Sequence, residues 1–507
     1  MDARVKPRSD GQGMDRLSSR TLARLPSAVA RPAYDRGAVA TGIVHLGIGA
    51  FHRAHAAVFT EVAIAAGDPR WGILGASLRS PDTRDALGPQ DFLYTVASRD
   101  DDAEALQVVG ALRGVLVAPE GPEALLAAMA DPRVAIVSLT VTEKGYGLDP
   151  ASGGLDASNA DIRHDLASPH RPRSAPGYLV EALARRREAD IAPFTVLCCD
   201  NLARNGETVG RVISELASLH DPGLGRFIAD AVAFPSTMLD RIVPATTESD
   251  REQIAQRLGL LDAAPAVAEA YNRWVVEDRF PAGRPDWAAA GVELVADIAP
   301  YEAIKLKLLN ASHSAMAYLG YLAGHETIAD ATADPVFLAF VSAMMDEEVT
   351  PTLKLPAQID VAAYKRTLIA RFANRAIRHR TWQIAMDGSQ KLPPRLLGTI
   401  RERLAAGAPF PRLALAVAGW IRYVIGTDER GVSIDVRDPL AERLRTIVAA
   451  TGPSPARLVP ALLAVPEIFG SDLPADPRFV DAVTVALERV HAVGARRAVA
   501  ERGSSST

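Results

Sequence analysis

Short, continuous hydrophobic runs alternate with stretches of helical periodicity in the first half of the chain. The runs cover residues 43–48, 71–78, 134–140 and 195–199, and the helical stretches cover residues 53–66, 122–130 and 177–189. Strands that are hydrophobic throughout and alternate with helices are typical of a mostly parallel sheet covered on both faces. The pattern therefore predicts an α/β fold for this part of the chain.

The later part of the chain has a different pattern, which is helical almost throughout. A Pro- and Gly-rich break at residues 280–286 and a last strand candidate at 292–296 separate the two parts. The predicted helices beyond it cover residues 336–347, 360–374, 394–405, 414–425 and 478–490. The predicted organisation is a flexible lead-in (1–35), an α/β domain (36–297), a mostly α-helical domain (298–495) and a tail (496–507) that is frayed from Gly503 onwards.

The region between residues 205 and 258 is predicted to be helical, with one irregular stretch at residues 234–244. The helical domain itself is predicted to open with a helix from Pro300 to Gly324, since Pro is tolerated in a first turn and Gly ends helices.

Three polar side chains lie within this opening helix: Lys305, Asn310 and His313. At about 100° per residue, Asn310 lies roughly 140° and His313 roughly 80° from Lys305, so all three share one side. A base, an amide and an imidazole together suit the transfer of an alcohol proton and the binding of a carbonyl oxygen. The alternative is an amphipathic helix whose polar side is simply solvated.

A glycine turn follows the first predicted strand. Gly47 and Gly49 allow the tight turn and close backbone approach that a dinucleotide pyrophosphate needs at a helix N-terminus. His52 occupies the place of the third glycine of that motif, and a plain strand-to-helix turn would also require glycine. Phe51, His52 and Arg53 follow the turn, and the Arg53 side chain could reach phosphate oxygens. The turn predicts a dinucleotide-binding domain of the Rossmann type.

Asp82 stands after the second strand, where a carboxylate can bind the adenosine ribose and repel a 2′-phosphate. It favours NAD over NADP, although Asp82 lies beyond the usual spacing and Arg79 nearby leaves room for NADP. The alternative is a turn or N-cap residue before a helix.

Composition narrows the class of partner. The chain has 507 residues, 48% hydrophobic and 23% charged, with 56 basic and 61 acidic side chains and a formal charge of −5. We therefore expect a small-molecule partner rather than nucleic acid or a membrane surface. The only cysteines, Cys198 and Cys199, are adjacent and within a predicted buried strand, which fits a reducing cytoplasm. We also expect no signal peptide and no membrane-spanning segment.

Two histidines near the glycine turn are candidate metal ligands. His52 and His55 are three residues apart, but no third ligand with metal-site spacing lies nearby, so no metal is expected. His45, within the first strand, is expected to be a packed core residue.

Four segments together resemble the mannitol dehydrogenase family of long-chain, polyol-specific dehydrogenases: residues 47–55, 199–201, 234–244 and 305–313. The resemblance extends from about residue 30 to 495. It implies a metal-free NAD(H) enzyme with an N-terminal Rossmann-type domain and a helical C-terminal domain.

The family pattern Lys-x4-Asn-x2-His implies that Lys305 is the general base. Such a lysine needs a pKa lowered towards the working pH. Glu302, one turn earlier, matches the family acid thought to pass the proton to water, although a surface ion pair with Lys305 is the alternative. Ala311 replaces a glycine common in the family, at little cost on a helix.

The same resemblance assigns the substrate contacts. Asn310 and Asn201 would hold the substrate oxygen, His313 would orient substrate or base, and Asp240 would contact the substrate. Residues 378–393 and 141–146 are most similar to the fructuronate reductase (D-mannonate oxidoreductase) branch. Arg378, Arg380 and Lys391 form a group of cations that a hexuronate carboxylate would favour.

D-Mannonate and D-fructuronate are therefore the favoured substrate pair, with mannitol 2-dehydrogenase or arabinitol dehydrogenase activity as the alternative. In either case the partner is a sugar alcohol or sugar acid, bound by a monomer or small homo-oligomer.

Two further alternatives remain open. Tyr301 and Lys305 satisfy the Tyr-x3-Lys pattern of short-chain dehydrogenases, but that family is about half this length and has a different glycine motif. The chain could also be a non-catalytic NAD-binding redox sensor, which would not need the set Lys305, Asn310, Asn201 and His313.

Overall fold

The computed structural model describes residues 14–101, 103–149, 153–356 and 359–503. The chain divides into two compact units, Met1–Ile298 and Ala299–Thr507. The sequence placed this boundary between residues 297 and 298. Each unit has its own hydrophobic core, and each is described by itself.

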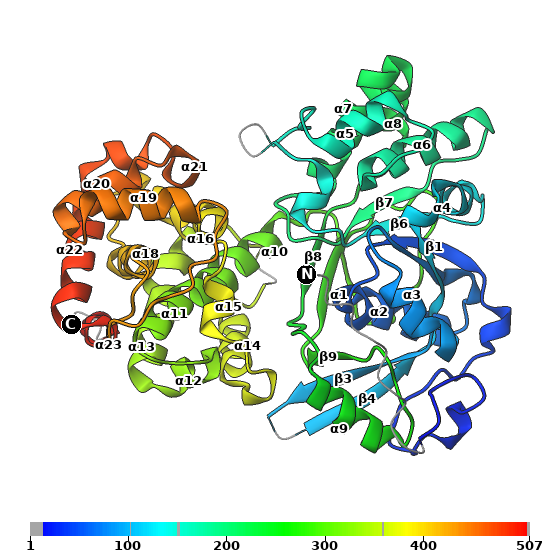
Figure 1. Ribbon diagram of the computed structural model, residues 1–507, viewed down its shortest axis with the longest axis horizontal. Helices are drawn as coiled ribbons and strands as arrows, with labels where there is room; N and C mark the ends of the chain where they lie inside the picture. The colour runs from blue at the N-terminus through cyan, green and yellow to red at the C-terminus, as the bar shows by residue number, and fades with distance from the viewer. Residues whose placement is uncertain (1–13, 102, 150–152, 357–358, 504–507) are drawn as a thin grey trace, which may run out of the picture. The chain divides into compact units, whose positions relative to one another are not determined.

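A five-stranded, all-parallel sheet forms the centre of the first unit (Figure 1). In spatial order its strands are β5 (Leu112–Val117), β2 (Gly72–Ser77), β1 (Thr41–Leu46), β6 (Ile136–Leu139) and β7 (Thr195–Cys198). The chain builds outward from β1 in one direction and then in the other. The carboxyl ends of β1 and β6 are thus the topological switch point, where α/β sheets bind ligands.

Side chains of β1 alternate between two cores. Val44 and Leu46 belong to the core under α4 (Pro122–Ala130), α6 (Ala175–Glu188), α7 (Asn205–His220) and α8 (Pro222–Ala231), whereas Ile43 faces the core that contains α2 (Ala56–Ala65). Helices therefore cover both faces, as the continuous hydrophobic runs predicted.

The predicted helix at 53–66 is two helices, α1 (Ala50–Ala54) and α2. They are separated at His55, whose backbone leaves helical geometry with φ −118° and ψ −92°.

Two further three-stranded sheets were not predicted in full. One consists of β4 (Ala103–Val109), β3 (Tyr94–Asp100) and β9 (Ala266–Glu269), and the other of β11 (Glu293–Val295), β10 (Arg273–Glu277) and β8 (Thr237–Asp240). Only β11 matched a predicted strand, and β8 lies within the stretch predicted to be irregular. Charged and small residues interrupt these strands, so they lack the continuous hydrophobic runs of the central sheet.

Both predicted terminal extensions are wrong over their described parts. Leu17 and Leu25 are buried in a core shared with β3 and β4, and the Ala30 N–H donates to Leu106 O. At the other end, α23 (Ala495–Gly503) buries Val499 against the second unit. In each segment, hydrophobic residues spaced among polar ones pack against the core of the unit.

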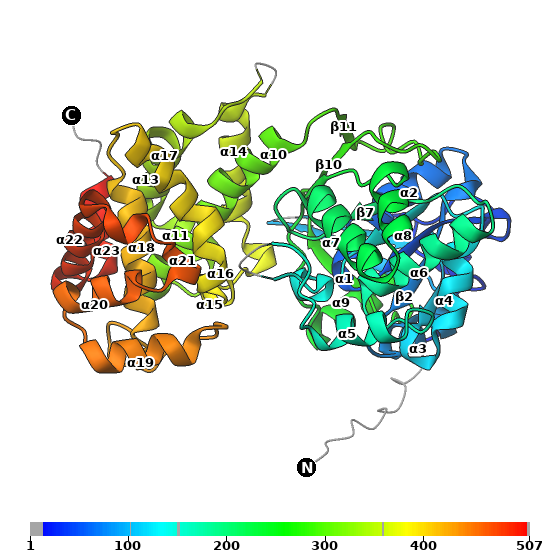
Figure 2. The same cartoon turned by 90° about the horizontal axis from the view of Figure 1, so that it is seen from above.

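The second unit is helical, which confirms the predicted fold class. Its long helix α11 (Ala311–Leu322) contacts α13 (Pro335–Ala343), α18 (Pro411–Val424) and α23 and lies within the unit's core (Figure 2). The predicted helices correspond to α13, α14 (Val361–Ala373), α17 (Gly398–Ala405), α18 and α22 (Pro477–Val493). Helices missed by the sequence include α12 (Ile328–Ala333), α15 (Thr381–Ala385), α16 (Gly388–Leu392), α19 (Ala441–Thr451), α20 (Pro455–Leu463) and α21 (Pro466–Phe469).

Candidate active site

The glycine turn lies at the switch point of the parallel sheet. Gly47 has φ +93°, and a Cβ there would lie 2.0 Å from Thr140 O, the residue after β6. Gly49 caps α1, and a Cβ there would meet no atom within 4 Å. Gly47 thus fits the turn tightly against the neighbouring strand, whereas Gly49 faces open space. This arrangement fits a dinucleotide phosphate approaching the backbone.

Hydrogen bonds of His45 stabilise the glycine turn. Its Nδ1 lies 2.8 Å from Ser138 Oγ and its Nε2 lies 2.8 Å from Thr140 Oγ1, while the Thr140 hydroxyl donates to Gly47 O at 2.6 Å. Burial lowers the pKa of His45 to about 3, so it is neutral at physiological pH. His45 is the packed core residue that the sequence predicted, and it holds the carbonyl side of the glycine turn.

His52 stacks on His45, with ring centroids 3.3 Å apart and planes inclined by 12°. Both ring nitrogens of His52 are buried without a hydrogen-bond partner, and burial lowers its pKa well below the usual range. His55 instead places Nε2 3.0 Å from Arg273 O. Among the described residues, no three His, Cys, Asp or Glu side chains are grouped to hold a metal ion.

Arg53 does not extend towards the glycine turn as the sequence predicted. Its guanidinium is buried, donates to the carbonyl of Ala264 and lies 5.2 Å from the ring centre of Tyr94. These contacts hold the side chain in the core of the unit, where its role is structural. Phe51 is half-buried and stacks on His55 with centroids 5.3 Å apart.

Asp82 is exposed at the first residue of α3 (Asp82–Leu87), and accepts a hydrogen bond from Ser80 Oγ at 2.8 Å. It lies five residues beyond β2, on the side of the sheet where β1 also ends. Arg79 is exposed in the same loop. Both side chains remain available to select between NAD and NADP, and the preference stays a prediction.

Asn201 follows β7 in a loop fixed by its neighbour Asp200. The Asp200 carboxylate accepts hydrogen bonds from the N–H groups of Val141 and Thr142, at 2.8 and 3.1 Å, and from the Tyr146 hydroxyl at 2.6 Å. Burial raises the pKa of this carboxyl, and these hydrogen bonds offset part of the effect. Asp200 thereby joins the loops after β6 and β7 and presents the exposed Asn201 at the carboxyl edge of the sheet.

Asp200 was not singled out by the sequence analysis. The sequence could have indicated it, because an acidic residue directly after a buried parallel strand lies at the ligand-binding edge of the sheet. Asp240, by contrast, is buried at the end of β8, where it lies opposite Arg273 of β10. Its predicted contact with substrate stays a prediction.

The opening helix of the second unit contains a π-helical turn. α10 (Ala299–Ile304) leads into the turn η7 (Lys305–Asn310), which continues as α11. In a π turn each N–H bonds five residues back and the rotation per residue is smaller, so residues five apart lie nearer in direction than in an α-helix. Lys305 and Asn310 are therefore closer in direction than the ideal α-helical spacing predicted. π turns occur frequently at functional sites.

Lys305 is half-buried, whereas Asn310 and His313 are 7% and 5% exposed. Their residues lie on one continuous helical segment, and the segment's other face packs in the core. Tyr301 and Glu302 lie half-buried on α10, one turn before Lys305. A solvated surface stripe is thus wrong for Asn310 and His313, which are buried polar groups that need partners.

His313 lies among aromatic and cationic side chains. Its ring is 4.6 Å from Phe372 and 5.2 Å from His379, centre to centre, and its buried Nε2 has no hydrogen-bond partner. Burial lowers the pKa of His313 well below its usual range, with the charges of nearby cations adding to the effect. The cations that act on it are Arg371, Lys391 and Arg395, together with His379 when protonated.

The structure separates the three cations that the sequence grouped, and their contact with substrate stays a prediction. Arg378 and Arg380 are exposed and lie 3.6 and 3.8 Å from Glu326, so they are surface ion pairs. Lys391 does belong to the group near His313, where its Nζ donates to Ile384 O at 3.1 Å. Arg395 donates to Ser314 Oγ at 3.2 Å. Lys391 and Arg395 share a helix face at i,i+4, a spacing that the sequence could have indicated.

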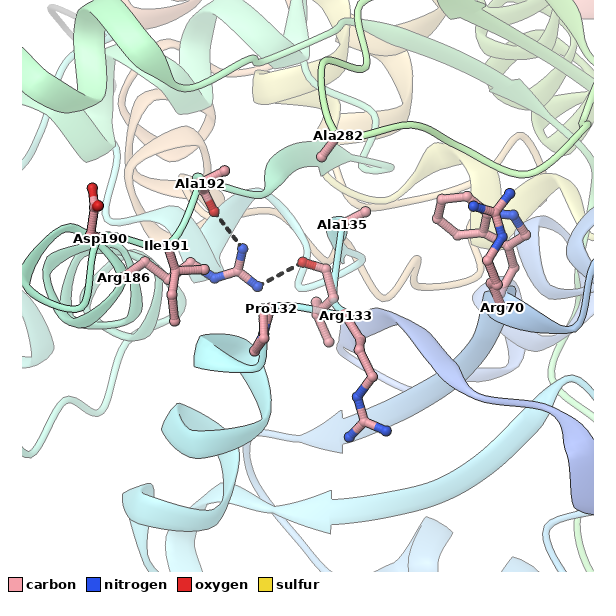
Figure 3. Close-up of a pocket in the computed structure, with 11 residues that line it drawn as sticks. Arg70, Pro132, Arg133, Ala135, Arg186, Asp190, Ile191, Ala192 and Ala282 are labelled. Carbon is pink, nitrogen blue, oxygen red and sulfur yellow. Dashed lines mark hydrogen bonds between the residues drawn. The ribbon is translucent and has the colours of Figure 1, made fainter.

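A cavity of about 400 Å³ lies at the opposite edge of the parallel sheet (Figure 3). It is lined by Val134 and Ala192, which precede β6 and β7, and by Arg186. Arg186 is buried and has its donors occupied by the backbone carbonyls of Met129, Asp131, Val134 and Ala192. Arg186 links the segments that lead into β6 and β7, so its role is structural. The cavity is separate from the glycine turn.

None of the helices in the described part of the chain is long and hydrophobic enough to cross a membrane.

Comparison with known proteins identifies both units. Residues 41–289 match the Mannitol dehydrogenase Rossmann domain, and residues 297–491 match the Mannitol dehydrogenase C-terminal domain. D-Mannonate oxidoreductase of Escherichia coli (strain K12) is 47% identical over 477 residues, which cover 93% of this chain and 98% of that protein.

Mannitol 2-dehydrogenase of Phaeosphaeria nodorum is 40% identical over 492 residues, covering 96% of this chain and 85% of the relative. A solved structure, the ternary complex of Pseudomonas fluorescens mannitol 2-dehydrogenase with NAD and D-mannitol, matches with a TM-score of 0.88 and 39% identity. It covers 96% of this chain and 99% of that one. The chain belongs to the mannitol dehydrogenase family and is a polyol dehydrogenase that acts on a CH–OH group.

Proposed function

We propose that the chain is an NAD-dependent enzyme that interconverts a sugar alcohol or aldonate with its ketose, with D-mannonate and D-fructuronate as the favoured pair. The observation that carries the reaction type is the π turn, which aligns Lys305 with Asn310 on the segment that also holds His313. These residues match the base and substrate-binding positions of the family motif.

The chemistry removes one proton and one hydride from the same CH–OH group. Lys305 takes the hydroxyl proton, and Glu302, one turn earlier, passes it towards water. Asn310 and Asn201 donate hydrogen bonds to the substrate oxygen as it becomes a carbonyl. His313, neutral because of its burial, hydrogen-bonds a substrate hydroxyl through Nε2. NAD, when bound, supplies the hydride acceptor.

The cofactor is assigned to the first unit. Gly47 and Gly49 let its pyrophosphate approach the backbone, since a Cβ at Gly49 would project into open space. Phe51 and His52 contribute through the first turn of α1, and the exposed Asp82 binds the adenosine ribose. Arg53 is left out because its guanidinium is buried against Tyr94.

A carboxylate on the substrate is supported by two observations. Identity to D-mannonate oxidoreductase is 47%, compared with 40% to a mannitol 2-dehydrogenase. Arg371, Lys391 and Arg395 all act electrostatically on His313, and a neutral polyol does not need such a group of cations. Oxidation of mannitol or arabinitol is the second candidate, supported by the structural match to the mannitol-bound enzyme.

A substrate panel tests the proposal. With NAD, D-mannonate should give a higher kcat/KM than D-mannitol or D-arabinitol, and with NADH, D-fructuronate should exceed D-fructose. Treatment with EDTA should leave turnover unchanged. A higher kcat/KM for D-mannitol would contradict the hexonate assignment, a higher one with NADPH would contradict the cofactor assignment, and absence of turnover with every substrate would favour the redox sensor.

A further inference from the structure

The alignment of Lys305 with Asn310 depends on the π turn being maintained. If η7 returned to α-helical hydrogen bonding, everything before it would rotate about the helix axis by roughly 100°, the step of one residue. Lys305 would then turn away from Asn310 and His313. Since π turns are rare and confined to single turns, contacts from outside the helix must select this register.

Lys307 makes the most specific of these contacts. It lies in the middle of η7, its side chain is 15% exposed, and its Nζ donates to Glu402 Oε2 at 2.6 Å. The same Nζ lies 3.5 Å from Thr352 O and 3.4 Å from Thr352 Oγ1. Leu308 and Leu309 are also anchored, but by hydrophobic packing, which is non-directional.

Both partners of Lys307 lie on helical segments that directly follow other π turns. Thr352 ends the short helix that follows η8 (Met344–Val349), and Glu402 lies on α17, which follows η11 (Pro393–Leu397). η7 contacts both η8 and η11. One ammonium group in the centre of the first π turn therefore joins the segments that follow the other two.

We propose that Lys307 is a positioning residue for Lys305. Its ion pair with Glu402 and its contacts with Thr352 hold η7 in the π register, which keeps Lys305 aligned with Asn310. This inference rests on the proposed role of Lys305 as the base. Lys307 itself does not contact the substrate, because its ammonium is occupied by Glu402 and Thr352.

The test is Lys307→Met, which keeps an unbranched stem of similar length and removes the ammonium. We expect kcat to fall at least about tenfold because the base is misplaced, with an unchanged dissociation constant for NADH. The deuterium isotope effect on kcat, with substrate deuterated at the carbinol carbon, should increase because the chemical step becomes slower. Lys307→Arg, which can still pair with Glu402, should recover kcat to within about threefold of wild type.

A matched control lies on the same helix as Glu402. Arg401 donates two hydrogen bonds to Asp472, at 2.6 and 2.9 Å, and has no part in η7. Arg401→Gln should lower Tm without changing kcat or the isotope effect. Glu402→Gln provides a second variant that leaves Lys307 in place, and it should lower kcat in the same direction as Lys307→Met.

The inference is overturned if Lys307→Met and Glu402→Gln lower Tm as Arg401→Gln does but retain kcat and the isotope effect. Failure of Lys307→Arg to recover kcat would also overturn it. The proposed function fails by a different result, namely wild-type turnover by Lys305→Ala, so the two failures are distinguishable.

Discussion

The candidate sites of the two units consist of different kinds of chemical group. In the first unit the site consists of backbone groups beside open space. A Cβ at Gly49 would meet no atom within 4 Å, and the nearby Arg53 is buried in the core. In the second unit it consists of side chains on one helical segment, Lys305, Asn310 and His313. A phosphate-binding turn needs room and N–H groups, whereas proton transfer needs aligned functional groups.

The histidines of the two units differ in the same way. His45 has both ring nitrogens within hydrogen-bond distance of fixed protein groups, Ser138 and Thr140. His313 is also buried, but its Nε2 has no hydrogen-bond partner. Burying an unpaired polar atom costs free energy unless a ligand supplies the missing hydrogen bond. The comparison assigns His45 to the structure of the site and His313 to its chemistry.

The largest expected effect comes from removing the proposed base. Lys305→Ala should lower kcat by about 10³-fold or more, because proton transfer by a positioned group contributes roughly 10²–10⁴-fold. The NADH dissociation constant, measured by fluorescence, should be unchanged because the glycine turn is intact. Tyr301→Phe is the control and should retain most activity. A comparable loss of kcat in that variant would mean that Tyr301, and not Lys305, exchanges the proton with the substrate.

Two glycine substitutions separate folding from binding within the first unit. Gly49→Ala should leave Tm nearly unchanged, since its Cβ meets no atom, but should weaken NADH binding at least about tenfold by filling the space before the turn. Gly47→Ala should cost about 2 kcal/mol or more in free energy of unfolding, because φ is +93° and the Cβ would clash with Thr140 O.

Thermal unfolding and NADH titration check this pair. If Gly49→Ala binds NADH as wild type does, the open space before the turn is not the cofactor site. If Gly47→Ala is as stable as wild type, the turn is less constrained than its contact with Thr140 requires.

The histidine comparison gives the next prediction. His313→Asn should lower kcat/KM for the sugar about 10–100-fold while NADH affinity and Tm change little, since leaving a buried hydrogen-bonding group without its partner costs roughly 1–3 kcal/mol. His45→Asn should instead lower Tm and weaken NADH binding. The opposite result, a loss of NADH affinity in His313→Asn alone, would reverse the two roles.

The sequence predicted best those features that depend on local pattern. The parallel strands were found because buried strands are hydrophobic throughout, and the glycine turn because its backbone geometry requires glycine. β3 and β4 were missed because charged and small residues interrupt them, so they lack the continuous hydrophobic runs of the central sheet. Residues 14–35 were missed because single hydrophobic residues such as Leu17 anchor them through distant contacts.

Side-chain positions in the second unit could be predicted only in part. The set Lys305, Asn310 and His313 was found, but its alignment was calculated for an ideal α-helix, and nothing in the local pattern indicates a π turn. The predicted cation group was Arg378, Arg380 and Lys391. The two arginines lie at the surface and only Lys391 acts on His313, because the sequence does not tell which cations tertiary packing brings to that histidine.

The smallest expected effect is a loss of stability in mild acid. Burial, with the nearby cations Lys391, Arg395 and Arg371, lowers the pKa of His379 to about 4, compared with about 6.5 in the unfolded chain. Between these values the unfolded chain binds more protons, so stability is fully present above about pH 6.5 and falls as the pH decreases towards 4. Between pH 7.5 and 6 this histidine should cost about 1 kcal/mol.

His379→Gln tests this effect, because a neutral amide of similar size should make Tm less dependent on pH over that interval. His45→Asn should flatten the dependence as well, since burial also lowers the pKa of His45. If Tm depended on pH in the same way in wild type and in His379→Gln, the environment of His379 would not hold the imidazole neutral. Lys391, Arg395 and Arg371 would then lie farther from His379 than the structure places them.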